Sequence, residues 1–249
     1  MSKIRIKGDT SGHVDLETSA TGSNLSIGGN TTVTGTAAIT GPATISGPNN
    51  YEGLIVENTA TDFAGGYIKI RDGNSTAGQY TWIGRNSDIT YVQSSNSNVA
   101  MQFTNAGIVT KENQPCFWAY MPSGNPTITV NPTKIPYTLT RFNVGNHFNT
   151  TNNRFIAPVE GKYLFQVNHN VYGLSDDQYF RTRIYVNGSP YGILGYAKAR
   201  GGGDHTTNDS MLISLSPSDY VEVFTSSNDT SYQMSAGIDW NHFSGFLVG

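Results

Sequence analysis

The stretch LSIGGN-TTVTGT-AAITGP-ATISGP, residues 25–48, decides the fold that we expect for the N-terminal part of this chain. It repeats every six residues, with a β-branched residue at one fixed position and a glycine two residues later. In an extended strand, alternate side chains point to opposite faces. The odd-numbered positions then form a small, apolar face, and the even-numbered positions form a hydroxyl-rich face. Such a strand needs an apolar partner on one side and water on the other.

One chain cannot supply that partner, because four six-residue units make little more than one coil of a solenoid, and a solenoid needs several stacked coils. Three copies wound around one axis would bury the apolar faces against each other. We therefore interpret residues 25–50 as the shaft of a homotrimeric fibre. Its predicted core consists of Ile27, Val33, Ile39 and Ile45. A flexible Gly/Thr/Ser linker is the alternative, but a linker has no reason to hold β-branched residues in register.

The composition of all 249 residues favours an all-β protein. Charged residues make up 13%, against about 25% in ordinary soluble domains, and Gly, Ser, Thr and Asn take their place. A net charge of −3 with no basic cluster argues against nucleic-acid binding. We expect no membrane span and no export signal, because no long apolar run occurs. The single cysteine, Cys116, is expected to be a structural residue on a buried strand.

Residues 1–24 and 51–110 flank the shaft. The first begins with alternating Ile4 and Ile6, and it resembles the N-termini of virion proteins of phages that infect marine cyanobacteria. We expect this segment to contact other virion proteins and so attach the fibre to a particle; the alternative is that it only starts the trimer. The second contains short apolar runs separated by turn residues such as Asp72-Gly73-Asn74. It is similar to the small β modules of phage tail fibres.

Residues 111–249 carry the most extensive motif, FIAPVEGKYLF at 155–165, followed by the turn Asn187-Gly188 and the closing FSGFL at 243–247. These segments resemble the globular heads of complement component one, subcomponent q, which are related to the tumour-necrosis-factor superfamily. The resemblance implies a ten-strand jelly roll that forms homotrimers. Its signature residues are Phe155, Pro158, Gly161, Tyr163, Phe165, Phe243, Gly245 and Phe246. Ser218 stands where the family usually has glycine, so we expect that turn to differ in shape.

Two structural roles follow for the signature residues. Gly161 is expected to permit a tight turn before the strand that contains Tyr163. The phenylalanines are expected to alternate into the sandwich core or onto the threefold axis: Phe155, Phe165, Phe243 and Phe246.

The candidate catalytic groups do not form a convincing site. Asp176 and Asp177 are adjacent, and adjacent residues on an extended chain point apart, whereas a glycosidase needs two carboxylates across a defined gap. We interpret two further groups as solvated loop residues: Asp204-His205 with Asp209, and Asp239 with His242. We therefore expect no enzyme activity and no cofactor. An ion at the trimer apex, bound by Asp204, His205 or Asp209, is the alternative, and the metal is unknown.

The sequence thus predicts a structural virion protein of a tailed phage, a trimeric fibre whose head binds a glycan or protein of the host surface. The expected contact loops run from Tyr172 to Tyr179 and from Tyr196 to Thr207, and their expected ligand-contact residues are Tyr172, Asp176, Asp177, Tyr179, Arg200, Asp204 and His205. A capsid decoration or cement trimer is the first alternative. A polysaccharide depolymerase is the second, although such enzymes usually bring a much longer β-helical domain.

The shaft interpretation predicts the effect of Val33→Asp combined with Ile39→Asp. Each change would place three carboxylates near one axis, and a buried unpaired charge costs several kcal/mol. Limited proteolysis should cut the double variant between about residues 25 and 50 and release a stable C-terminal fragment. Resistance equal to that of the wild type would mean that these side chains face solvent.

Overall fold

The computed structural model describes residues 66–70, 81–86, 88–94, 98–201 and 203–249. All regular structure among these residues is β, and no helix occurs in them, which confirms the predicted fold class for this part of the chain. The expected shaft core, Ile27, Val33, Ile39 and Ile45, lies outside the described residues.

The first described unit is a five-stranded antiparallel sheet in chain order. Its strands are β1 (Gly66–Ile70), β2 (Thr81–Asn86), β3 (Ile89–Ser94), β4 (Asn98–Thr104) and β5 (Val109–Thr110). The register aligns Ile68, Ile83, Val92 and Met101 in one row across four strands. Ile68 and Ile83 are about two-fifths exposed in the isolated chain. This sheet therefore presents an apolar row that its own chain covers only in part.

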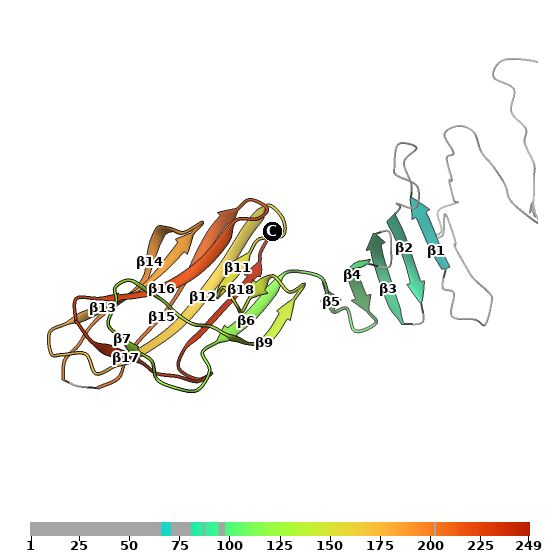
Figure 1. Ribbon diagram of the computed structural model, residues 1–249. Helices are drawn as coiled ribbons and strands as arrows, with labels where there is room; N and C mark the ends of the chain where they lie inside the picture. The colour runs from blue at the N-terminus through green and yellow to red at the C-terminus, as the bar shows by residue number, and fades with distance from the viewer. Residues whose placement is uncertain (1–65, 71–80, 87, 95–97, 202) are drawn as a thin grey trace, which may run out of the picture. The chain divides into compact units, whose positions relative to one another are not determined.

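The second described unit is a sandwich of two antiparallel sheets (Figure 1). The sheet centred on β12 contains β6 (Cys116–Tyr120), β7 (Thr127–Ile128), β9 (Leu139–Val144), β12 (Gly161–Tyr172), β15 (His205–Leu215), β17 (Tyr232–Met234) and β18 (His242–Leu247). The sheet centred on β16 contains β8 (Thr133–Lys134), β10 (Phe148–Asn149), β11 (Arg154–Ile156), β13 (Tyr179–Val186), β14 (Ser189–Lys198) and β16 (Tyr220–Ser227). Without the two-residue strands β7, β8 and β10, ten strands remain, the number expected for the jelly roll.

Aromatic rings fill the space between the two sheets. The ring centroids of Phe117 and Phe155 lie 5.2 Å apart, and those of Phe165 and Phe243 lie 5.6 Å apart. Each of these side chains is at most 1% exposed, and burying one phenylalanine contributes about 1.5–3 kcal/mol. Gly245 makes room for this packing, because an added Cβ would lie 2.6 Å from Cδ1 of Phe165.

Phe246 does not join this core. Phe155, Phe165 and Phe243 are buried as expected, whereas Phe246 is 47% exposed in the isolated chain. Phe243 and Phe246 are three residues apart on β18, so their side chains point to opposite faces of the sheet.

The structure gives a different picture of Gly161 and of the turn at Ser218 from the one that the sequence suggested. Gly161 is the first residue of β12, and an added Cβ there would lie 2.6 Å from Cδ1 of Leu247. Gly161 therefore lies in close contact with the Leu247 side chain, and its backbone is not in the left-handed conformation. Ser218 has φ 75°, the left-handed conformation that usually favours glycine, so the turn keeps that local geometry despite the substitution. Asn187 and Gly188 both have positive φ in the β13–β14 hairpin, as an Asn-Gly turn requires.

A buried histidine lies between the sheets near one end of the sandwich. His169 is fully buried, and its Nδ1 lies 2.9 Å from Thr182 Oγ1, which is 2.7 Å from Thr207 Oγ1. Its Nε2 has no hydrogen-bond partner among the described residues. Burial lowers the pKa of His169 to about 3, so the folded protein holds this imidazole neutral at physiological pH.

The neutral histidine predicts a pH dependence of stability. An unfolded histidine has a pKa of about 6.5, so below that pH the unfolded chain binds a proton that the folded chain does not. The free energy of unfolding should therefore fall by about 1.4 kcal/mol per pH unit on acidification from about pH 6, and this loss should end near pH 3, where the folded histidine protonates.

Denaturant unfolding between pH 7 and pH 4 would measure this slope. His169→Asn is the matched variant, because it removes the titrating ring and keeps a polar side chain. The other groups titrate equally in both proteins, so the wild type should show the steeper slope. Parallel slopes would contradict a buried neutral histidine.

Candidate functional site

The register of the β12-centred sheet brings apolar residues together on the face that points away from the core. This surface, called the uncharged face, consists of three rows that cross β15, β12, β18, β6 and β9. The rows are Leu212–Leu164–Phe246–Cys116–Val144, Ser210–Gln166–Ser244–Trp118–Phe142 and Asn208–Asn168–His242–Tyr120–Leu139. None of them contains Asp, Glu, Lys or Arg, and the first row is apolar throughout.

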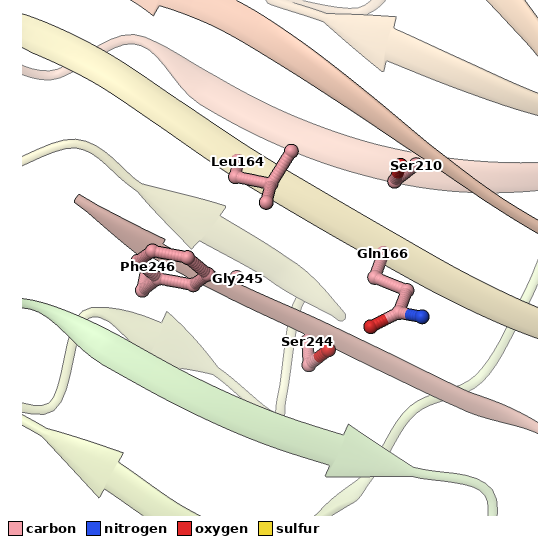
Figure 2. Close-up of a pocket in the computed structure, with 6 residues that line it drawn as sticks. All are labelled: Leu164, Gln166, Ser210, Ser244, Gly245 and Phe246. Carbon is pink, nitrogen blue, oxygen red and sulfur yellow. The ribbon is translucent and has the colours of Figure 1, made fainter. Parts of the chain in front are cut away.

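The large side chains of the uncharged face remain open to solvent in the isolated chain. Leu212 is 54% exposed, and Phe246 and Phe142 are nearly half exposed. Figure 2 shows Leu164 and Phe246 on neighbouring strands, with Gln166 and Ser244 beside them, around a shallow hollow of about 230 Å³. The Arg141 guanidinium lies 4.6 Å from the Trp118 ring centre, so a cation stacks on this face although the three rows contain no charged residue. An exposed patch with apolar side chains, aromatic rings and a stacked arginine is typical of a protein–protein interface.

Cys116 lies in the apolar row of this face. It belongs to a strand, as predicted, but its side chain points away from the sandwich core and is only half-buried. Burial raises the pKa of its thiol. A raised pKa leaves less thiolate at neutral pH, which does not suit a nucleophile.

The structure brings the two expected contact loops side by side at one end of the sandwich. We call this region the loop end, comprising residues 172–179 and the described residues of 196–205. Lys198 Nζ lies 2.8 Å from Asp177 Oδ1, and the Gly201 N–H donates to Asp176 Oδ1 at 2.9 Å. The ion pair with Lys198 lowers the pKa of Asp177. Both carboxylates therefore tie one loop to the other.

A third loop, which contains Asn228 and Asp229, binds the backbone of residues 172–179. The N–H of Ser175 donates to Asp229 Oδ2 at 2.6 Å, and the N–H of Tyr179 donates to Asn228 Oδ1 at 2.7 Å. Burial acts to raise the pKa of Asp229, but the donated hydrogen bonds outweigh it, and the pKa is lowered. The loop is thus held by a charge-assisted hydrogen bond to Asp229 and a neutral one to Asn228, which order its backbone before any ligand arrives.

The remaining sequence candidates do not converge on one point. Asp204 precedes β15, His205 begins it, and Asp209 lies about 13 Å further along the strand than His205. Tyr172 ends β12, and Arg200 is exposed in the second loop. His242 packs edge-on against Trp118, with ring centroids 5.4 Å apart. Across the described ranges, no three His, Cys, Asp or Glu side chains lie close enough to hold a metal ion.

Sequence reasoning placed Tyr179 and Tyr196 in the two expected contact loops but missed that they stack on each other and that Arg181 joins them. The rings of Tyr179 and Tyr196 stack with centroids 5.4 Å apart, and the guanidinium carbon of Arg181 lies 4.4 Å from the Tyr179 ring centre. Strand alternation could have placed Tyr179 and Arg181 on one face. The pairing of Arg181 with Tyr196 depends on the β13–β14 register, which includes two bulges.

Comparison with known proteins gives one family and several similar folds. A curated relative, the uncharacterized protein YqcC of Bacillus subtilis strain 168, is 30% identical over 102 residues; the match covers 38% of this chain and 27% of YqcC. The chain thus spans about a quarter of the length of that relative. No helix in the described ranges is long and apolar enough to cross a membrane.

Two solved structures are similar to the sandwich. The globular domain of zebrafish complement 1qA is 14% identical, with a TM-score of 0.41, covering 55% of this chain and 98% of that one. The TNF protein Eiger from S. frugiperda is 6% identical, with a TM-score of 0.45, covering 55% of this chain and 94% of that one.

The strongest assignment comes from the C1q domain, whose family profile matches residues 119–248. This range contains nearly all of the sandwich, including the signature segments at 155–165 and 243–247. Because the match covers more than half of the 249 residues, the chain belongs to the C1q-domain family.

Proposed function

We propose that this chain forms a trimeric appendage of a tailed-phage virion, and that its C-terminal head attaches the particle to the host surface. The observation that carries the proposal is the uncharged face, whose half-exposed Leu212, Phe142 and Phe246 need a protein partner. A second and a third copy of the same chain are the partners that best fit it.

Three further features support a trimer. Domains of the C1q family typically form homotrimers. The six-residue register of residues 25–48 calls for apolar contact between chains. The five-stranded sheet leaves the row around Ile68 and Ile83 partly open. Each feature belongs to a different segment of the chain, and each is satisfied by the same assembly.

Attachment by non-covalent contact fits the chemistry of the head. C1q-family domains are binding or structural modules rather than enzymes. At the loop end, Asp176 and Asp177 are engaged by Gly201 and Lys198, so neither is positioned as a free acid or base. Three heads on one trimer gain from multivalency, since the second and third contacts become effectively intramolecular.

The virion assignment rests on the N-terminal segments. A fibrous β shaft before a compact head suits a particle that must hold its binding domain away from its body. In this proposal, residues 1–24 contact other virion proteins, the shaft spans residues 25–50, the small β module spans 51–110, and the head spans 111–249.

The attachment proposal predicts the effect of changing Tyr179 and Arg200 together to Ala. Both residues belong to the loop end, and neither lies in the aromatic core. The double variant should adsorb to susceptible cells at least about tenfold more weakly than the wild type, a loss equivalent to about 1.4 kcal/mol, while its melting temperature stays nearly unchanged. Adsorption of labelled full-length protein to marine cyanobacterial cells is the measurement.

The matched control changes Glu160 and Lys162 to Ala, two exposed residues at the opposite end of β12. If particles that lack this protein adsorb normally but their capsids become fragile to heat, the attachment role is wrong and the capsid-decoration role takes its place. New reducing ends after incubation of the protein with host polysaccharide would instead favour a depolymerase.

A further inference from the structure

The outward face of β13 and β14 carries an aromatic platform beside cationic side chains. Tyr179, Arg181 and Arg183 alternate along β13, and Tyr196 and Ile193 lie opposite the two arginines on β14. Tyr196 and Ile193 are each more than half exposed. The guanidinium of Arg181 contacts both tyrosine rings, at 4.4 and 5.7 Å from their centres. We call these five side chains the Tyr–Arg face.

Both arginines of the Tyr–Arg face have unused hydrogen-bonding capacity. Within the part of the chain that the structure describes, ion pairs join Lys134 to Glu222, Lys198 to Asp177 and Arg85 to Asp88, and none includes Arg181 or Arg183. The Nε atoms of Arg181 and Arg183 are buried without a hydrogen-bond partner among the same residues. A guanidinium offers five donors in a planar fork; because the Nε atoms are shielded from solvent, an acceptor would approach the terminal Nη groups of each fork.

The acidic groups nearby do not neutralise this face. Asp177 is held by Lys198, and Asp176 accepts from the Gly201 backbone. Glu222, the acidic residue on the outward side of β16, is held by Lys134 at 2.7 Å. The Tyr–Arg face is therefore an aromatic surface with two unpaired positive charges, which is complementary to an anion that also has an apolar side.

A sugar ring that bears a carboxylate has this combination. The C–H groups of a pyranose pack against the negative face of an aromatic ring, and a carboxylate accepts two parallel N–H bonds from one arginine. We propose that the Tyr–Arg face binds an acidic saccharide, with Tyr196 stacked on the sugar ring and Arg181 paired with its carboxylate. This inference rests on the proposed attachment function, for which it names the ligand class.

The backbone holds the Tyr–Arg face rigid. Residues 181 and 183 lie two apart on β13, so their side chains emerge about 7 Å apart on the same side. The bulges of β14 turn Tyr196 and Ile193 outward while Gly195 faces inward, where an added Cβ would lie 2.4 Å from Thr207 Cβ. A site built on strands keeps its geometry better than one built on loops, and two cations in line suit a polymer with repeated carboxylates.

Binding of the full-length protein to immobilised polygalacturonate would test the proposal. The carboxyl-reduced polymer serves as the neutral probe, and dextran sulfate serves as the probe for charge alone. We expect Arg181→Gln and Tyr196→Ala each to weaken binding to polygalacturonate at least about tenfold, and Arg181→Lys to weaken it less, because charge without the planar fork retains part of the attraction.

Arg154→Gln is the matched control. The Arg154 guanidinium lies 4.5 Å from the Tyr220 ring centre on the same sheet, outside the Tyr–Arg face, and its removal should leave binding within about twofold. Thermal melting of each variant separates loss of binding from loss of fold.

The proposal is overturned if the wild type does not bind polygalacturonate, if it binds the reduced polymer equally well, or if Arg181→Gln binds normally. The proposal is also overturned if dextran sulfate binds as tightly as polygalacturonate and Tyr196→Ala weakens binding to neither polymer, because charge attraction alone would then explain the binding. Cell adsorption separates this inference from the attachment function. Adsorption that survives Arg181→Gln leaves attachment intact without this ligand, whereas saccharide binding without adsorption leaves the site intact without attachment.

Discussion

An antiparallel sheet in a sandwich usually turns an apolar face to the core and a polar face to water, but the β12-centred sheet of this protein also carries an apolar row on its outer face. Its inner face holds Phe117, Phe165 and Phe243, which are fully buried. Its outer face aligns Leu212, Leu164 and Phe246 in one uncharged row. The inner face explains how the head folds within one chain, and the outer face is the surface on which the proposed trimer would be built.

The same sheet connects assembly to binding. β12 begins with Gly161, which packs closely against Leu247. It then crosses the aromatic core and ends with Tyr172 at the loop end. The hydrogen bond that Asp229 accepts from the Ser175 N–H holds the loop-end backbone in place. In a trimer built on the uncharged face, three such loop ends would be displayed by one rigid scaffold, so that weak individual contacts with a surface could act together.

The parts of the fold that depend on local sequence were predictable. Strand alternation and turn residues indicated an all-β chain, Asn187-Gly188 indicated its hairpin, and three of the four signature phenylalanines lie in the core. Phe246 shows the limit of this reasoning. Its residue type alone allowed either a core position or one on the threefold axis, and only the register of β18 shows that it points away from the core.

Features that depend on contacts distant in sequence were not predictable. Leu212, Leu164, Phe246 and Cys116 form one row only because three strand pairings align them. Tyr179 and Tyr196 were chosen as separate loop residues, but the structure stacks them around Arg181. Gly161 lies in close contact with the side chain of Leu247, 86 positions further along the chain. No local pattern contains that information.

Thiol labelling of the native full-length protein would test most directly whether the uncharged face is buried between copies. In a Cys116→Ser background, Leu212→Cys places a thiol where the isolated chain leaves the side chain 54% exposed, and Val130→Cys places one at a position that is 67% exposed. A buried interface predicts that the thiol at 212 reacts at least about a hundredfold more slowly than the thiol at 130, because only the rare open state reacts. Comparable labelling rates at the two positions would mean that the face is open to solvent, and would contradict the trimer on which this account depends.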